Sequence, residues 1–158
     1  MYPDHHLFGL ADAGTADQPP PPVPAADGHW VSAADSAVLI RTAQDGATVT
    51  VRLQAMDGPP GEPEPDAEAV SHTVQLDLPT GQISVNQIAA GWMHDVFALP
   101  APGSYRLRIT AWSRTRTADA YNRLFTTHNP ADPAFENARQ ALDGQETYLV
   151  QLWRASEA

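Results

Sequence analysis

Short stretches of alternating hydrophobic and polar residues recur along the chain, and a period of two is typical of half-buried β-strands. The clearest runs from Val70 to Leu78, where apolar residues and one histidine alternate with polar residues. Strands are also predicted at residues 38–41, 48–53, 83–85, 97–99, 105–112 and 147–153, the first from a short apolar run and the last from its β-branched and aromatic residues. The Asp45-Gly46 pair between the first two of these predicts a hairpin, because this dipeptide readily adopts the backbone of a tight turn.

One segment has the period of a helix. Asp132 and Pro133 suit the N-cap and first helical positions, and Gly144 suits the end of the helix. The apolar residues between them fall at helical spacing: Phe135, Ala138, Ala141 and Leu142. We therefore predict an all-β fold, an antiparallel β-sandwich of about six to eight strands, with one short helix in a late insertion at residues 115–145.

Two proline-rich segments, residues 12–28 and 57–66, interrupt the predicted strands. Proline fixes φ and has no N–H to donate, so we expect both segments to be loops or polyproline II rather than helix or central strand. The chain has 158 residues, which is close to the length of one average domain, and we treat residues 1–158 as a single domain.

The chain contains no cysteine, which excludes disulfide bonds, cysteine-based zinc sites, iron–sulfur clusters and thiol nucleophiles. No apolar run approaches the roughly 20 residues that span a bilayer. Residues 1–10 lack the basic and apolar regions of a signal peptide. We therefore expect a cytoplasmic protein that does not bind membranes.

The net charge of −10 is distributed unevenly along the chain. Residues 1–104 contain 2 Arg, 10 Asp and 3 Glu, a net charge of −11, whereas residues 105–158 contain 7 Arg, 3 Asp and 3 Glu, a net charge of +1. This balance disfavours nucleic acid and anionic membranes as partners and favours a basic protein. All 9 cations are arginine, a composition typical of GC-rich genomes such as those of actinobacteria.

Candidate catalytic and metal-binding residues are scarce. The histidines lack the i, i+2 or i, i+4 spacing, backed by a carboxylate, that a zinc site requires: His5, His6, His29, His72, His94 and His128. The chain has no nucleophile-elbow motif, no phosphate-binding glycine loop and no paired carboxylates on neighbouring elements. We therefore expect no metal, no cofactor and no enzymatic activity, and a hydrolase that uses His72 or His94 is the alternative.

Two surfaces are candidates for binding. Carboxylates gather in and beside the second proline-rich segment, where they would be solvated and would attract a basic protein: Asp57, Glu62, Glu64, Asp66 and Glu68. The alternative surface is one face of the strand at 105–112 and the residues after it, where arginine and tryptophan suit a sugar ring or a carboxylate: Arg106, Arg108, Trp112 and Arg114. We expect the other tryptophans to pack in or beside the core: Trp30, Trp92 and Trp153.

Two stretches resemble the DNA-entry nuclease inhibitor family, also known as competence protein J. They are the tyrosine-, histidine- and phenylalanine-containing start, Tyr2–Phe8, and the stretch Phe97–Ile109, in which a leucine–proline, glycine and tyrosine corner leads into an arginine-rich strand. The end of the chain, Glu146–Trp153, resembles the closing strand of related actinobacterial proteins of unknown function. The stretch from Thr115 to Gly144 is longer than in that group.

The resemblance implies a β-sandwich without catalytic residues that binds another protein, as an inhibitor or immunity factor against a nuclease or other basic toxin. The preferred hypothesis is therefore a non-enzymatic protein-binding module whose acidic surface meets a basic partner. The alternative is a carbohydrate- or small-ligand-binding sandwich, which would present exposed coplanar aromatic rings on the Arg/Trp face.

Overall fold

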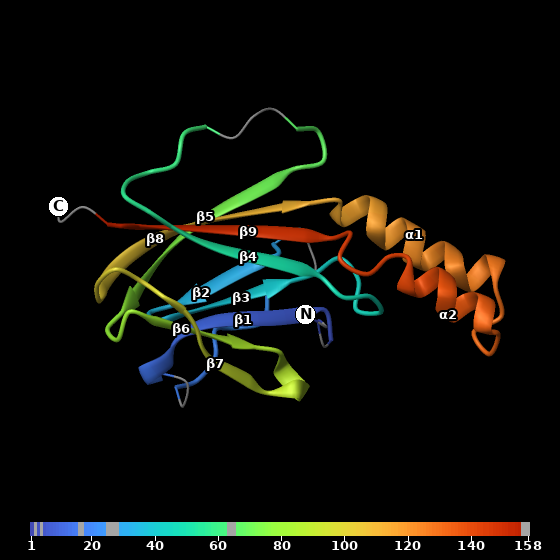
Figure 1. Cartoon of the computed structure of the whole chain (residues 1–158), viewed down its shortest axis with the longest axis horizontal. Helices are drawn as coiled ribbons and strands as arrows, with labels where there is room; N and C mark the ends of the chain where they lie inside the picture. Colours follow the sequence, from blue (N-terminus) through green and yellow to red (C-terminus); the bar gives the residue numbers. More distant parts are fainter. Residues whose placement is uncertain (2, 4, 16–17, 25–28, 63–65, 156–158) are drawn as a thin grey trace.

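The computed structural model describes residues 1–158 except 2, 4, 16–17, 25–28, 63–65 and 156–158. Within the described residues it contains nine strands and two α-helices (Figure 1). In chain order they are β1 Leu7–Asp12, β2 Val31–Ala34, β3 Ala37–Arg41, β4 Thr50–Met56, β5 Val70–Leu78, β6 Gln82–Asn86, β7 Trp92–Ala98, β8 Gly103–Trp112, α1 Arg114–Thr127, α2 Pro133–Gln140 and β9 Thr147–Arg154. No described helix is long and apolar enough to cross a membrane.

The strands form two sheets. The five-stranded sheet has the order β2-β3-β1-β6-β7, and the four-stranded sheet has the order β4-β9-β8-β5. All pairs are antiparallel except β4 and β9, which run parallel in register from Thr50–Thr147 to Met56–Trp153. The prediction of purely antiparallel pairing was wrong at this pair, because the chain passes through both helices before β9 enters between β4 and β8. As a central strand with a parallel neighbour, β9 is rich in β-branched and aromatic residues.

Both sheets contribute to one hydrophobic core. Alternate residues of β8 and β9 point into it and are at most 2% exposed: Tyr105, Leu107, Ile109, Tyr148, Val150 and Leu152. From the other sheet, Phe8, Leu10 and Ile40 are equally buried, and the ring centroids of Phe8 and Tyr148 lie 5.2 Å apart, edge to face. The fold is therefore mostly β, with two largely antiparallel sheets, and the strands predicted at 105–112 and 147–153 are confirmed.

The Asp45-Gly46 pair does not form the predicted hairpin. β3 and β4, which flank it, belong to different sheets, so the connection crosses from one sheet to the other. A Cβ at Gly46 would lie 2.1 Å from ring atoms of Tyr121 in α1. The carbonyl oxygen of Gly46 accepts a hydrogen bond of 2.7 Å from Arg139 in α2. The glycine is required because a helix side chain approaches the backbone this closely.

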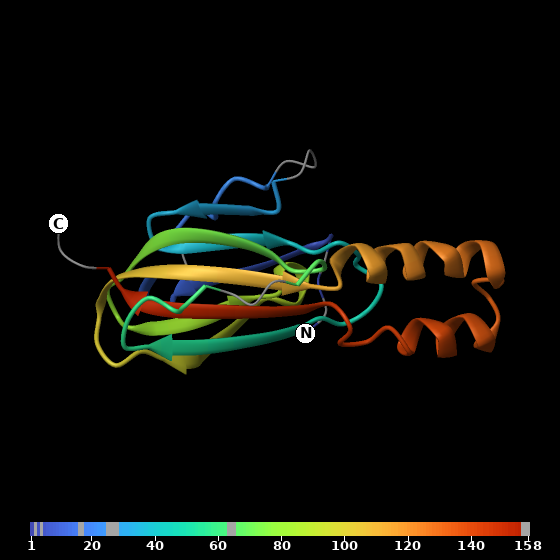
Figure 2. The ribbon, with the colours of Figure 1, turned by 90° about the horizontal axis from the view of Figure 1, so that it is seen from above.

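The late segment contains two helices rather than one. α2 begins at Pro133 with Asp132 at its N-cap position, as predicted, and α1 occupies a region that was expected to be a loop. The helices share a small second core with the 42–49 connection: Ala47, Leu124, Phe135 and Leu142. Figure 2 shows the pair extending from one end of the sheets, and we call residues 114–140 the helical arm.

The first proline-rich segment covers the outer face of the five-stranded sheet. Pro21 and Pro24 are buried, whereas the two residues between them are exposed, which is the three-residue period of polyproline II. Ser32 donates a hydrogen bond to the carbonyl oxygen of Pro22, and Arg41 donates two, of 2.7 and 3.1 Å, to that of Pro24. The described residues 18–24 are thus held against β2 and β3.

Candidate functional site

The acidic residues predicted to bind a partner lie on the connection between β4 and β5. The four that the structure describes are all exposed: Asp57, Glu62, Asp66 and Glu68. Glu64 lies outside the described residues. Asp57 and Glu62 make no hydrogen bond or ion pair with any described residue. Asp66 accepts a hydrogen bond of 2.9 Å from the N–H of Glu68, and the Glu68 carboxylate lies 3.6 Å from the Arg116 guanidinium.

The structure divides the predicted Arg/Trp face. Arg106, Arg108 and Trp112 alternate along β8 with the core residues, so they lie on the outer face of the four-stranded sheet. Arg114 does not join them. It is the first residue of α1, and its side chain is only 16% exposed because it points toward buried residues of β9.

The acidic connection and the Arg/Trp face are neighbours in space. Arg108 donates one hydrogen bond of 2.7 Å to the carbonyl oxygen of Gly61 on the connection, and its other nitrogens donate to the Gln151 side chain in β9 at 2.8 and 3.2 Å. Trp153, which is in register with Arg106 on the same face, is only 8% exposed. Figure 1 shows the described ends of the connection rising over this face. The two candidate surfaces therefore adjoin each other.

Arg114 belongs to a buried polar cluster at the base of the helical arm. Its Nη1 donates to the carbonyl oxygen of Arg41 at 2.6 Å and to the hydroxyl of Tyr148 at 2.7 Å, and it lies 3.6 Å from the carboxylate of Glu146. The guanidinium carbon also stands 4.9 Å from the centroid of the Trp30 ring, a cation–π distance. This cluster joins the first turn of α1 to both sheets.

Glu146 is the centre of that cluster and is fully buried. Its carboxylate accepts hydrogen bonds from the Tyr148 hydroxyl, from the N–H of Ala43 at 2.8 Å and from the Gln44 side chain at 3.4 Å. Burial, and then the neighbouring Glu146 charge, raise the pKa of Tyr148 well above its ordinary value, while Arg114 acts in the opposite direction. All of these groups have partners, so the cluster serves to hold the arm.

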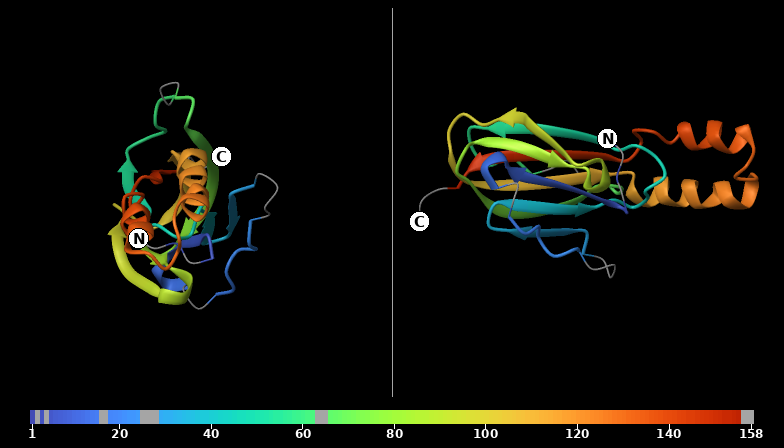
Figure 3. Two further views of the ribbon diagram at one scale, coloured as in Figure 1. Left: turned by 90° about the vertical axis from the view of Figure 1, so that its right-hand side faces the viewer. Right: turned by 90° about the horizontal axis from the view of Figure 1, so that it is seen from below.

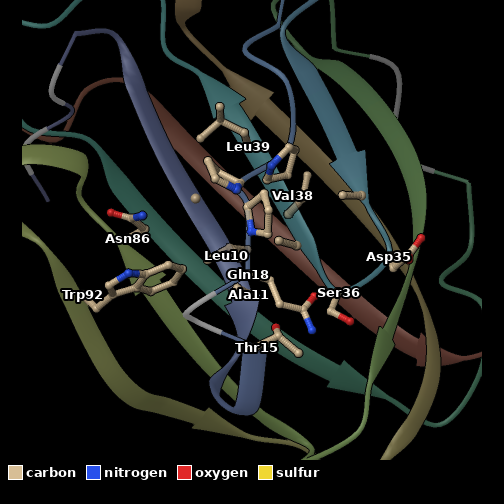
Figure 4. A pocket seen from close by; sticks show the side chains of 16 residues that line it. Leu10, Ala11, Thr15, Gln18, Asp35, Ser36, Val38, Leu39, Asn86 and Trp92 are labelled. Atoms are coloured by element: carbon tan, nitrogen blue, oxygen red, sulfur yellow. The ribbon is translucent and has the colours of Figure 1, made fainter.

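A cavity of about 400 Å³ lies between the proline segment and the outer face of the five-stranded sheet (Figure 4). Small residues of β1 and β3 form its floor, and Pro19–Pro21 lie over it. Figure 4 places Trp92 and Asn86 on one side and Gln18, Thr15 and Ser36 on another. Among the described lining residues, Asp35 is the only charged one and none carries a positive charge. Such a lining suits a neutral, partly apolar group better than an anion.

The side of the cavity formed by Asn86 and Trp92 is built on a strained turn. Ile88, between them, has a φ of 61°, in the left-handed region that a β-branched residue rarely adopts. Its N–H donates to the Asn86 side-chain oxygen at 2.7 Å, and Gly91 completes the turn with a φ of 82°. Strain of this kind persists only where the surroundings enforce it. Sequence analysis missed this cavity because its lining comes from strands and loops far apart in the chain.

Replacing Ile88 by asparagine is expected to raise the free energy of unfolding by about 1 kcal/mol, because asparagine tolerates the left-handed conformation. Ile88 is half-buried, so the gain is limited by the apolar contact that is lost. Urea unfolding of the two proteins at equal concentration measures the difference. A clear loss of stability in the variant would contradict the expectation and show that packing of Ile88 outweighs its backbone strain.

The histidines are dispersed. His94 stacks on Trp92 with ring centroids 6.4 Å apart, His72 meets Trp30 edge to face at the same distance, and His6 lies 3.5 Å from Asp45. Among the described residues, no group of three histidine, aspartate or glutamate side chains is arranged to hold a metal ion.

No family model and no curated protein matches this chain. Among solved structures it is similar to ComJ from Bacillus subtilis, an inhibitor of the DNA-degrading activity of NucA, with a TM-score of 0.54 and 16% identity over 98% of this chain and 92% of that chain. It is also similar to the product of crocagin biosynthetic gene J, with a TM-score of 0.43 and 15% identity over 94% of this chain and 90% of that one. The likeness to ComJ shows a shared fold, and it confirms at that level the resemblance to the competence protein J family found in the sequence.

Proposed function

We propose that this chain is a non-enzymatic β-sandwich module that inhibits or neutralises a basic protein, such as a nuclease, by binding it through the acidic β4–β5 connection. The observation that carries the proposal is that the carboxylates of Asp57 and Glu62 are exposed and that neither forms an ion pair with a described residue. Solvated carboxylates of this kind raise the local negative potential and steer a basic partner during encounter.

Two further observations support the proposal. The fold is shared with ComJ, which inhibits the DNA-degrading activity of NucA. The net charge of −10 also disfavours binding of this chain to nucleic acid. An inhibitor of this kind would therefore bind the nuclease and not its nucleic-acid substrate.

The test neutralises three acidic residues of the connection together, as Asp57→Asn, Glu62→Gln and Asp66→Asn. We expect the wild-type chain, immobilised and exposed to extract from its own cells, to retain a basic protein at low salt and to release it as salt rises. The triple variant is expected to retain it about ten-fold less, because the attracting charge is lost. Quantitative mass spectrometry of the retained proteins measures both effects.

A matched control removes three exposed charges elsewhere, as Asp35→Asn, Asp119→Asn and Asp132→Asn. It changes the net charge by the same amount and is expected to retain the partner as the wild type does. If both triple variants retain the partner equally weakly, the effect comes from the net charge of the chain and not from the acidic connection. Retention that does not respond to salt or to either variant would contradict the electrostatic proposal.

The carbohydrate-binding alternative has less support. It requires exposed, coplanar aromatic rings on the Arg/Trp face, whereas Trp112 is half-buried, Trp153 is 8% exposed and Arg108 is bonded to the connection. Wild-type tryptophan fluorescence that responds to a panel of glycans would restore it.

A further inference from the structure

Each sheet has two edge strands, and the edges of the two sheets approach each other differently on the two sides of the molecule. On one side the edge strands β5 and β2 lie together, and the N–H of Asp77 donates to the carbonyl oxygen of Asp35 at 2.7 Å. On the other side the edge strands are β4 and β7, and no hydrogen bond joins them among the described residues. The left view of Figure 3 shows β4 and β7 on one side of the molecule and β5 on the other.

A hollow of about 480 Å³ lies between β4 and β7. The described residues of its lining are apolar except for one threonine: Met1, Val49, Thr50, Val51, Leu53, Val85, Met93, Val96 and Phe97. Met93 is 47% exposed and Val96 is 37% exposed, and both stand among the few large hydrophobic side chains that the described residues leave at the surface. An apolar hollow bordered by exposed apolar residues is typical of an interaction site.

The two strands beside the hollow differ as edges. β7 is interrupted by a register shift between Ile83 and Val85 of its partner strand, an irregularity that protects an edge from further pairing. β4 is regular along all seven residues and, within the described part of the chain, pairs only with β9. It contains no proline and no bulge, so the backbone groups on its free side are available to another strand.

The chain itself already uses the start of this edge. The amino group of Met1 donates to the carbonyl oxygen of Val49 at 2.9 Å, and the N–H of Val49 donates to the carbonyl oxygen of Met1 at 2.7 Å. Two reciprocal bonds are the pattern of an antiparallel pair. The Met1 side chain packs against the core at the same time. Just beyond this pair, Val51, Leu53 and Ala55 of β4 pack on the core and leave the edge beside them open.

We propose that the free edge of β4 and the adjoining hollow bind an extended segment of the basic partner, which adds to β4 as an antiparallel strand and places alternate apolar side chains in the hollow. Strand addition satisfies the unpaired backbone groups and fills side-chain pockets on one face, and a helix would do only the second. This inference rests on the proposed function as far as the identity of the partner is concerned.

The antiparallel direction and the charge beside β4 together place the basic residues of the segment. β4 ends at Met56, and Asp57 of the acidic connection follows at once. An antiparallel strand begins beside the end of β4 and finishes near Met1. Basic residues would therefore precede the apolar residues of the bound segment, where they meet Asp57.

The probe is a labelled peptide with two lysines followed by three repeats of valine and threonine, and its reversed sequence serves as the orientation control. We expect the wild-type chain to bind the forward peptide at least ten-fold more tightly than the Val96→Asp and Met93→Asp variants do. Val70→Asp is the matched control, since Val70 is 43% exposed on β5, on the opposite side, and it is expected to bind as the wild type does. Fluorescence anisotropy measures affinity, and amide hydrogen exchange locates the new protection in β4.

Several outcomes overturn the proposal. If the peptide binds equally to Val96→Asp, Met93→Asp and Val70→Asp, the hollow does not contribute to binding. If the peptide binds without new protection in β4, it does not add to the edge of that strand. Protection of β4 that appears on raising the concentration of the chain alone would make the edge an interface between two copies. The neutralised triple variant Asp57→Asn, Glu62→Gln and Asp66→Asn separates the two proposals. If it loses only the preference for the forward peptide, the edge stands whatever happens to capture of the natural partner.

Discussion

Replacing Glu146 by alanine is expected to lower the free energy of unfolding by about 3–5 kcal/mol, the largest effect of any polar substitution that we predict. Glu146 is fully buried, and its carboxylate accepts hydrogen bonds from Ala43, Gln44 and Tyr148. Its removal leaves the Arg114 guanidinium beside buried groups without its counter-ion, and it leaves the N–H of Ala43 without an acceptor. An uncompensated charge at a largely buried position costs far more than a lost surface ion pair.

The helical arm should be affected first. Arg114 begins α1, and Glu146 lies at the start of β9, so the pair connects both ends of the segment that contains the arm. Without it, the arm keeps the small core around Leu124 and Phe135 and its contacts with Gly46, but it loses its buried ion pair. Hydrogen exchange in α1 and α2 should therefore accelerate more than exchange in β8.

Urea unfolding of wild type, Glu146→Ala and Glu136→Ala makes the measurement. Glu136→Ala is the matched control, because it also removes a glutamate bonded to an arginine, Arg139, but on the exposed surface of α2. The control is expected to lose only a small fraction of the stability that Glu146→Ala loses, since water replaces the lost partner. Similar losses in the two variants would contradict the structural role assigned to Glu146.

The strands with the clearest alternation, β5 and β8, have one face toward the core and one face toward polar surroundings, so the period of two is visible in the sequence. β8 is the clearest case, with Leu107 and Ile109 fully buried and Arg106 exposed. β5 shows the limit of the method, because its alternation continues to Val70 although only Leu76 and Leu78 are buried.

The period of two revealed neither the four-residue β2 nor β1, and β1 is buried on both faces. All six residues of β1 are buried: Phe8 and Leu10 lie in the core, and Gly9 and Ala11 face the proline segment. Polar residues are therefore largely absent, and the alternation disappears. Only the resemblance to the competence protein J family indicated a strand near this position.

The missed helix α1 buries little. Of its residues, only Thr117 and Leu124 are buried, since beyond its first turn the helix packs against α2 and one connection. Its apolar positions Ala120, Tyr121 and Leu124 do have helical spacing, a signal that could have been found. The ring of Tyr121 in this helix also explains the wrongly predicted hairpin at Asp45-Gly46. Gly46 is required because Tyr121, 75 positions later in the chain, packs against it, and not because of a local turn.

The candidate site was predicted in its parts but not in its arrangement. Exposure of the described acidic residues follows from their place in and beside a proline-rich segment, and the outward direction of Arg106 and Arg108 follows from alternation. Nothing local in the sequence shows that Arg108 bonds the connection at Gly61 or that Arg114 turns inward to Glu146. Both facts depend on long-range packing.

Above pH 10 the stability of the protein is expected to fall by about 1.4 kcal/mol per pH unit through Tyr148 alone. Burial and the Glu146 charge raise the pKa of Tyr148 in the folded state well above its ordinary value of 10.0. Below pH 10 this tyrosine is neutral in both states, so it adds no pH dependence. At higher pH the unfolded chain loses the phenolic proton while the folded chain keeps it, and deprotonation then favours unfolding.

Tyr148→Phe tests this linkage. At pH 8 the variant is expected to be less stable than the wild type by about 1–2 kcal/mol, because Glu146 and Arg114 lose the hydroxyl between them. Between pH 10 and 11.5 the difference in free energy of unfolding between the two proteins should shrink, because only the wild type is destabilised by deprotonation of Tyr148 in the unfolded chain. The chain has no lysine and no cysteine, so few other side chains titrate in this range and arginine stays charged. Urea midpoints that stay parallel from pH 8 to 11.5 would mean that the Tyr148 hydroxyl reaches solvent in the folded protein.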